Sequence, residues 1–217
     1  MITKKESVNI LTESAMMVAL SVVLGFFTIP LPFTIYGGGV TFASSIPIAF
    51  LSYRRGLKVG VAAAFIVSVI QLLMGLNNLS YGAGSALAVI SIIMVDYILP
   101  FTVIGFAGMF RSLNRKNTRI GQITTFGLGI LTVMVLRFIS HLISGSVVWY
   151  ELSLSWAEQG DLILNYPNQP WLYSFIYNIS YMLPETVIAL VVGIIIASVI
   201  CIRSPKFKFE NNSDRKD

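Results

Sequence analysis

The chain has 217 residues, of which 55% are hydrophobic and 12% charged, and it carries a formal net charge of +5. Its mean hydropathy is +0.78. Soluble domains carry about 25% charged residues, so this composition excludes an ordinary soluble protein and indicates an integral membrane protein. The apolar runs are continuous and long enough to cross about 30 Å of hydrocarbon, which argues against a barrel of alternating strands.

The pattern predicts an all-α integral membrane protein, a six-transmembrane-helix bundle with an outward-facing ligand pocket. The expected helices span residues 8–28, 41–54, 57–76, 84–110, 120–147 and 171–202. The second is short and contains Pro47, so we expect it to be tilted or to cross incompletely. Residues 1–208 are expected to form this single membrane domain, followed by a polar, disordered cytoplasmic tail at 209–217.

Basic residues predict the orientation. All of them except Arg137 fall before the first expected helix or after the second, fourth or last one. The positive-inside rule makes this side cytoplasmic, which predicts an even number of spans and two cytoplasmic termini. Cys201 is the only cysteine, so no intrachain disulfide can form. The start of the chain lacks the cleavage pattern of a signal peptide, and we expect it to be retained.

Two outer connections are candidates for covering a pocket. Residues 29–39 combine two prolines and three consecutive glycines with apolar residues. Irregular backbone at membrane depth is tolerated where protein covers it or where it lines a cavity. The segment therefore fits either a lid or a simple surface hairpin. The longer connection, from Tyr150 to Pro170, either helps to close the pocket or anchors its aromatic residues at the membrane interface.

Ionisable side chains inside apolar runs are the main candidates for function, because they are costly in a bilayer and usually face a bundle interior. Asp96 lies in the fourth expected helix and His141 in the fifth, while Tyr173 and Asn178 open the sixth. Counted from the outer helix ends, these four residues lie at similar depth. Their agreement in depth favours one site in the outer half of the bundle.

The residue types at this site suit an organic cation. Asp96 supplies a countercharge, and the aromatic faces of Tyr97, Trp149 and Tyr173 each contribute about 0.5 to 2 kcal/mol of cation–π attraction. His141 and Asn178 add hydrogen-bond donors and acceptors for a heteroaromatic ring, although a lone histidine is also a common structural residue. A second interpretation is an ion pair between Asp96 and Arg137 that joins two helices.

Several activities find little support in the sequence. One histidine and one cysteine in different helices do not make a recognisable metal site, and no cofactor is expected. Ser140 and Ser144 are poorly placed to act as nucleophiles beside His141, so an enzyme is not expected. There is no P-loop, and any ATP-driven step must come from a partner. Ala15 and Ala19 form a small-xxx-small surface on the first helix that permits close approach of another helix.

The chain resembles the thiamine-specific substrate-binding subunits, or S components, of energy-coupling factor (ECF) transporters (the ThiT or YuaJ family). The resemblance runs from the first helix to the sixth. It is strongest in Ser140-His141-Leu-Ile-Ser-Gly145 and in Trp171-Leu-Tyr173-Ser-Phe-Ile-Tyr-Asn178-Ile-Ser-Tyr-Met-Leu-Pro184-Glu185. This similarity implies thiamine enclosed near the outer face of six helices in a bacterial cell membrane.

By resemblance, the thiamine site comprises Asp96, Tyr97, His141, Gly145, Trp149, Tyr173 and Asn178. The carboxylate would balance the thiazolium charge, and the close backbone at Gly145 would leave room for the ligand. The family's Ala-x-x-x-Ala surface for the transmembrane coupling subunit matches Ala15 and Ala19. The first outer loop departs from the family's Gln-Gly-Gly-Ser type, since Tyr36-Gly37-Gly38-Gly39 stands there and makes Tyr36 the candidate substitute for its ligand contact.

The leading prediction is a subunit that captures thiamine outside the cell and delivers it inward with a transmembrane coupling subunit and two ATPase subunits. One alternative is an S component for another small molecule, such as a pyrimidine precursor or another vitamin. Another is a stand-alone proton-coupled carrier that uses Asp96 and His141 as a relay. A membrane-embedded hydrolase finds support only in the histidine.

Overall fold

The computed structural model describes residues 3–32, 37–82 and 84–203. Five helical rods in this part of the chain are long and apolar enough to cross a membrane. They are α1 (Lys4–Phe26), α3 (Leu57–Met74), the rod Ala86–Leu113, the rod Arg119–Trp156 and α8 (Pro170–Val199). The protein is therefore a helical, multi-pass membrane protein.

Two of the rods change their winding along their length. The first comprises α4 (Ala86–Ser91), the π-helical η2 (Ile92–Ile98), α5 (Leu99–Thr102) and the 3₁₀-helical η3 (Val103–Leu113). The second comprises α6 (Arg119–Ser144), the π-helical η4 (Gly145–Trp149) and α7 (Tyr150–Trp156). The remaining elements are short: β1 (Thr28–Ile29), β2 (Val40–Thr41), α2 (Ile46–Arg55) and the 3₁₀ helices η1 (Leu76–Gly82) and η5 (Leu162–Asn165).

The second expected helix is present but shorter than predicted. The predicted range began at residue 41, whereas α2 begins at Ile46 and has 10 residues, too few to span about 30 Å of hydrocarbon. Thr41 instead pairs with Thr28 in the antiparallel β1–β2 ladder. Pro47 falls at the start of α2, where a missing backbone N–H costs nothing. The expectation that this helix crosses incompletely is thus confirmed, and only its predicted start at residue 41 is wrong.

The fifth expected helix continues further than predicted. Its end was placed at residue 147, but the rod runs through η4 and α7 to Trp156. Gly145 has helical angles, φ −60° and ψ −37°, so the glycine does not break the rod. The outer connection predicted from Tyr150 therefore begins with helix, and the non-helical part starts after Trp156.

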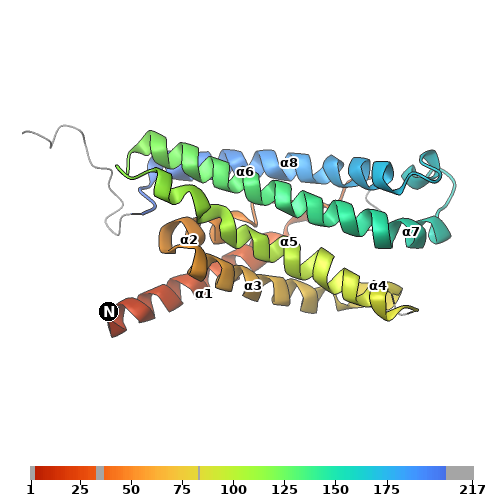
Figure 1. Cartoon of the computed structure of the whole chain (residues 1–217), viewed down its shortest axis with the longest axis horizontal. Helices are drawn as coiled ribbons and strands as arrows, with labels where there is room; N and C mark the ends of the chain where they lie inside the picture. The colour runs from red at the N-terminus through yellow and green to blue at the C-terminus, as the bar shows by residue number, and fades with distance from the viewer. Residues whose placement is uncertain (1–2, 33–36, 83, 204–217) are drawn as a thin grey trace, which may run out of the picture.

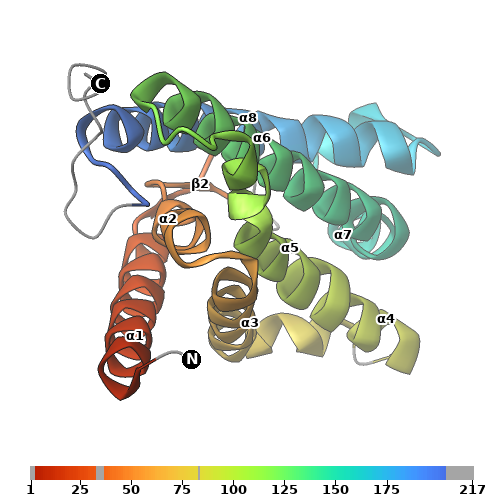
Figure 2. The same cartoon turned by 60° about the vertical axis from the view of Figure 1, so that its left-hand side comes forward.

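Figure 1 shows the rods lying roughly along the long axis, with α6 beside α8 and with α1 and α3 on the opposite side of the bundle. Figure 2 gives the end-on arrangement, in which α2 lies between α1 and the α6–α8 pair. A tight core joins α2, η3, α6 and α8 around Tyr53, Phe126 and Ile130. α6 and η3 pack so closely here that a Cβ atom on Gly129 would lie 1.9 Å from the Ala107 carbonyl oxygen.

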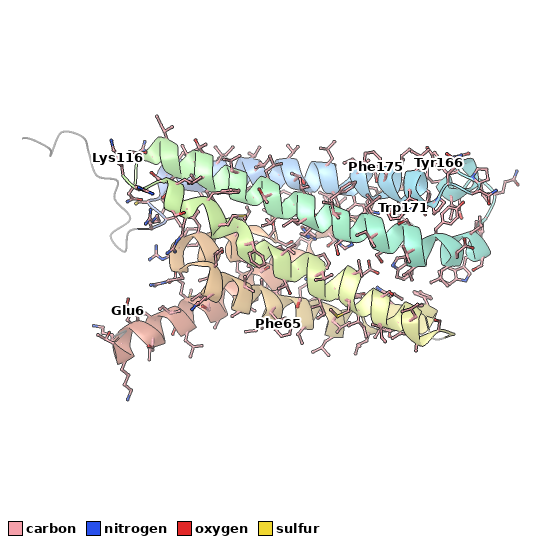
Figure 3. All side chains as sticks on the ribbon, viewed as in Figure 1. Glu6, Phe65, Lys116, Tyr166, Trp171 and Phe175 are labelled. Atoms are coloured by element: carbon pink, nitrogen blue, oxygen red, sulfur yellow. The ribbon has the colours of Figure 1, made fainter. Side chains whose placement is uncertain are left out.

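The outer surface of the bundle is apolar, as expected of a protein in lipid. Phe65 on α3 and Trp171 and Phe175 on α8 are 49%, 55% and 46% exposed. Figure 3 shows Lys116 at one end of the molecule and Tyr166 with Trp171 towards the other. Exposed apolar area on this scale requires a non-aqueous environment, because soluble monomers rarely expose it.

The surface expected to dock a partner is uncovered in the structure. Ala15 and Ala19 lie on the exposed side of α1. Val18 and Ser21 are the buried residues of this helix. At the basic end, Glu13 forms ion pairs with both Arg54 and Arg55, which ties α1 to the end of α2.

Candidate ligand-binding site

The half of the bundle that contains η1 and η4 encloses a cavity of about 330 Å³. Its walls come from the segment after β1, from η1 and η2, and from the two long rods α6–α7 and α8. The seven predicted ligand residues in the described part of the chain all line it, namely Asp96, Tyr97, His141, Gly145, Trp149, Tyr173 and Asn178. Tyr36, the eighth candidate, lies outside the described residues.

Both π-helical segments fall at this cavity. Asp96 and Tyr97 belong to η2, and Gly145 and Trp149 are the first and last residues of η4. A π turn contains an extra residue, which rotates the following side chains relative to a regular α-helix, and such turns are frequent at functional sites. The widened turns therefore determine which side chains of the two rods face the cavity.

The Asp96 carboxylate is held by two groups from the α6–α7 rod. The Trp149 indole Nε1–H donates a 2.6 Å hydrogen bond to Oδ2, and His141 Nδ1 lies 3.6 Å from Oδ1. The Asp96 and His141 side chains are each 16% exposed. Both oxygens thus have neighbours, yet the carboxylate remains accessible from the cavity and presents a negative charge there.

Tyr97 is positioned by η1, a segment for which the sequence predicted no role. Asn78 Nδ2 donates to the Tyr97 hydroxyl at 2.7 Å, and that hydroxyl donates to the Gly75 carbonyl at 3.2 Å. A Cβ atom at Gly75 would lie 2.1 Å from the hydroxyl oxygen, so a glycine is needed at this approach. Asn78 also lines the cavity. It was not predicted as a site residue, because the segment between the two rods shows no helical periodicity in the sequence.

One face of α8 forms a ladder of polar and aromatic groups. Tyr173, Tyr177, Tyr181 and Glu185 follow one another at four-residue spacing, and all of them line the cavity. Consecutive tyrosine rings lie 5.6 and 6.3 Å apart between centroids. The sequence predicted a ligand contact for the first of these residues and not for the other three. Their helical spacing from Tyr173 is the signal that places all four on one face.

Asn178 and Gly145 bring α8 against the α6–α7 rod. The Asn178 amide donates to the Ser174 carbonyl at 2.8 Å and to the His141 carbonyl at 3.3 Å, and its Oδ1 accepts from the Tyr181 hydroxyl. A Cβ atom at Gly145 would lie 2.2 Å from Ser174 Oγ. The glycine thus permits close helix packing as well as lining the cavity.

The Arg137 ion pair differs from the prediction. Its expected partner was Asp96, but Nη1 lies 3.1 Å from Glu185 Oε1, and the two side chains are 6% and 2% exposed. Arg137 lies one helical turn before His141 on α6. At this position Glu185 of α8, and not Asp96 of η2, is within reach of its guanidinium. The interpretation of Asp96 as a partner of Arg137 is therefore wrong, and among the described residues Asp96 has no Lys or Arg partner.

The segment that precedes α2 has features of both predicted structures, a hairpin and a cover for the cavity. Its ends pair as β1 and β2, so it is a hairpin, while Gly37, Gly38 and Gly39 line the cavity. Gly38 has a φ of +86°, and a Cβ atom on it would lie 2.9 Å from the Tyr181 ring. The Tyr177 hydroxyl donates to the Gly37 carbonyl. Irregular backbone is thus covered by α8, as membrane depth requires.

The charges of the cavity favour a cationic guest. Arg137 and Glu185 neutralise each other, which leaves Asp96 as the remaining fixed charge among the described lining residues. Tyr97, Trp149 and Tyr173 surround the cavity with aromatic rings. Within the described residues no group of three or more His, Cys, Asp or Glu side chains is arranged to hold a metal ion. The arrangement suits a small aromatic cation held by one carboxylate.

Comparison with known proteins agrees with this geometry. The model of the family described as "Thiamine transporter protein (Thia_YuaJ)" matches residues 11–206. The thiamine transporter ThiT of Bacillus subtilis is 30% identical over 191 residues, which cover 84% of this chain and 86% of the relative. ThiT of Lacticaseibacillus paracasei is 28% identical over 151 residues, which cover 68% of this chain and 67% of that protein.

A solved structure of ThiT from Listeria monocytogenes has the same fold, with a TM-score of 0.67 and 22% identity over 93% of this chain and 98% of that one. The family model covers far more than half of the sequence. The chain therefore belongs to the ThiT/YuaJ family of thiamine transporters, the substrate-binding components of ECF transporters.

Proposed function

We propose that the cavity of about 330 Å³ is the thiamine site and that Asp96 supplies the countercharge for the thiazolium ring. Tyr97, Trp149 and Tyr173 pack against the flat rings of the vitamin. Each cation–π contact contributes about 0.5 to 2 kcal/mol, and the desolvated carboxylate adds a charge–charge attraction that is stronger in the cavity than in water.

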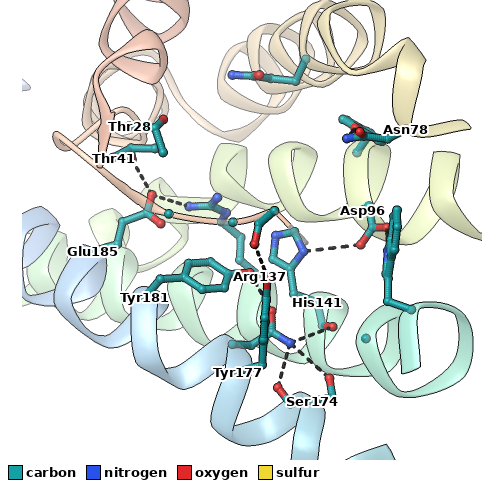
Figure 4. A pocket seen from close by; sticks show the side chains of 18 of the residues that line it. Thr28, Thr41, Asn78, Asp96, Arg137, His141, Ser174, Tyr177, Tyr181 and Glu185 are labelled. Carbon is teal, nitrogen blue, oxygen red and sulfur yellow. Dashed lines mark hydrogen bonds and ion pairs between the residues drawn. The ribbon is translucent and has the colours of Figure 1, made fainter. Parts of the chain in front are cut away.

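The observation that carries this proposal is the environment of Asp96. Figure 4 shows the carboxylate facing His141 across the pocket, while Arg137 lies with Glu185 at the other side. A carboxylate without a basic partner of fixed charge is costly to bury unless a ligand completes the pair. His141 and Asn178 then supply hydrogen-bonding groups for the pyrimidine ring.

Titration of the detergent-purified chain with thiamine tests the proposal through tryptophan fluorescence. Trp149 lines the cavity, whereas Trp156 and Trp171 do not, so stacking on the ligand should quench the emission saturably. The change should become much smaller in Trp149→Phe, while Trp171→Phe, at an exposed position, should keep it. A wild-type chain that shows neither a saturable signal nor calorimetric binding would contradict the proposal.

The chain is a transporter component and not an enzyme, and we propose that uptake requires partners that hydrolyse ATP. A transmembrane coupling subunit would dock on the exposed Ala15–Ala19 surface of α1, and two ATPase subunits would drive the release of thiamine inward. Small residues at four-residue spacing allow close helix approach in a bilayer. Transport by the purified chain alone in liposomes under a proton gradient would contradict this and favour a stand-alone carrier.

We propose further that the cavity opens to the outside of a bacterial cell membrane and that both termini are cytoplasmic. Among the described residues, the basic side chains other than Arg137 lie at the start of α1, around the α2–α3 and η3–α6 connections and after α8. Figure 3 shows one of them, Lys116, at the end of the molecule opposite Tyr166. Because the positive end faces the cytoplasm, the cavity half faces outward. The single domain of residues 1–208 belongs to this proposal, while the tail at 209–217 lies outside the described residues.

A further inference from the structure

A second polar cluster lies in the cavity, away from Asp96. It consists of Arg137 on α6, Glu185 on α8 and Thr41 on β2, and all three line the cavity. Figure 4 shows this cluster and Asp96 on opposite sides of His141. Arg137 is 5% exposed and Glu185 is 1% exposed. The cavity thus has two polar ends, and the proposed role of Asp96 accounts for one of them.

The cluster has unused hydrogen-bonding capacity. Glu185 Oε1 accepts from Arg137 Nη1 at 3.1 Å and from Thr41 Oγ1 at 2.6 Å. Arg137 Nε is buried, and within the described residues it has no hydrogen-bond partner. The second carboxylate oxygen of Glu185, Oε2, likewise has no hydrogen bond to the described part of the chain. Buried polar groups without partners are rare and point to a water or a ligand group.

We infer that this cluster is a subsite for a hydroxyl group on the tail of the ligand. A hydroxyl can donate its proton to Glu185 Oε2 and accept a hydrogen bond from Arg137 Nε–H at the same time. A protonated amine cannot accept and an ionised carboxylate cannot donate, so neither can do both. Thiamine carries one alcohol, on its hydroxyethyl chain, so the inference rests on the proposed function and names the atoms that would receive that group.

The same cluster selects against a phosphorylated tail. The guanidinium of Arg137 is already neutralised by Glu185, so the subsite carries no net charge. A phosphate ester offers acceptors and negative charge, which Glu185 repels, and it cannot serve as a donor for Oε2 when it is fully ionised. The subsite therefore favours the free alcohol over its phosphate esters, although an arginine is present.

Three ligands test the wild-type chain by calorimetric titration: thiamine, an analogue with ethyl in place of hydroxyethyl, and thiamine monophosphate. The ethyl analogue should bind at least about tenfold more weakly than thiamine, because it leaves both polar atoms unpaired. The monophosphate should also bind at least about tenfold more weakly. If the ethyl analogue binds within about twofold of thiamine, the subsite is wrong while the thiamine site stands. If thiamine itself does not bind, the proposed function fails.

The variant Glu185→Gln tests the charge argument. It removes the repulsion and frees Arg137 to pair with phosphate, so the preference for thiamine over its monophosphate should shrink by at least about tenfold. Glu158→Gln, an exposed change on the outer connection, should leave that preference unaltered. An unchanged preference in a folded Glu185→Gln protein would overturn the charge argument. Should this variant fail to fold, the wild-type comparison with the ethyl analogue decides the question.

Discussion

At the scale of single residues, the cavity is lined by Asp96, His141 and Asn178, which come from three different rods. Their common position was predictable, because the depth of each residue could be counted from the ends of the apolar runs. Depth does not tell which of two carboxylates faces a given arginine. The sequence therefore did not identify the partner of Arg137. That partner is Glu185, the last residue of the motif that begins at Trp171, for which no role was predicted.

Gly145→Ala provides the sharpest steric prediction. The added methyl would lie 2.2 Å from Ser174 Oγ and would push α8 away from the α6–α7 rod. Overpacking of this kind costs about 1 to 3 kcal/mol, so we expect a lower unfolding temperature and thiamine binding weakened about tenfold or more. Calorimetry and thermal unfolding in detergent measure both effects.

Gly127→Ala is the matched control, because it lies on the same helix and nothing stands within 4 Å of the position of its added methyl. This variant should be as stable as the wild type or slightly more stable, since alanine favours a helix by about 1 kcal/mol over glycine. Equal behaviour of the two variants would show that the close approach at Gly145 does not matter.

At the scale of elements, the apolar length of a segment was the most reliable signal. It located the five long rods, because a helix needs about 20 apolar residues to cross the membrane. The two π-helical segments, η2 and η4, were not predictable, because the extra residue in such a turn leaves no compositional mark. The start of α2 was also missed, since the expected helix began at Thr41, which instead pairs with Thr28 of β1.

The exposed face of α1 should serve docking and not ligand binding. In the double variant Ala15→Leu and Ala19→Leu, two bulky side chains replace the small residues that permit close helix contact. Thiamine binding by the purified chain should stay within about twofold, while copurification with the coupling subunit and thiamine uptake by cells should be lost.

Ala62→Leu supplies the comparison, because Ala62 is an exposed alanine on another rod, α3. Uptake should remain normal in this variant. Normal uptake in the double α1 variant, or a loss of thiamine binding in it, would contradict the docking role.

At the scale of the whole molecule, the two halves of the bundle differ in construction. The half near the basic end is closely packed around Tyr53 and Phe126, and the other half is hollowed by the cavity. The sequence predicted the polarity of the two ends from its basic residues. It also predicted a ligand pocket, but not the contributions of Thr41 and Asn78 to its lining, since these depend on packing between segments that are distant along the chain.

Cysteine labelling tests the orientation of this arrangement. In a Cys201→Ala background, Glu158→Cys should react with a membrane-impermeant maleimide added to intact cells. Lys116→Cys should react after permeabilisation and not before. Both positions are exposed. Figure 3 shows Lys116 at one end of the molecule and Tyr166, which lies in the same connection as Glu158, towards the other end. The reverse pattern of labelling would place the cavity on the cytoplasmic side and contradict the positive-inside argument.

The central claim is that the Asp96 carboxylate exists to balance a positive charge on the guest. The most direct test measures the binding of thiamine and of a neutral isostere of its thiazolium ring to the wild type and to Asp96→Asn. The wild type should prefer the cation by about 100-fold, roughly 3 kcal/mol, and the variant should prefer it by less than about tenfold. A preference that survives unchanged in folded Asp96→Asn protein would contradict the account.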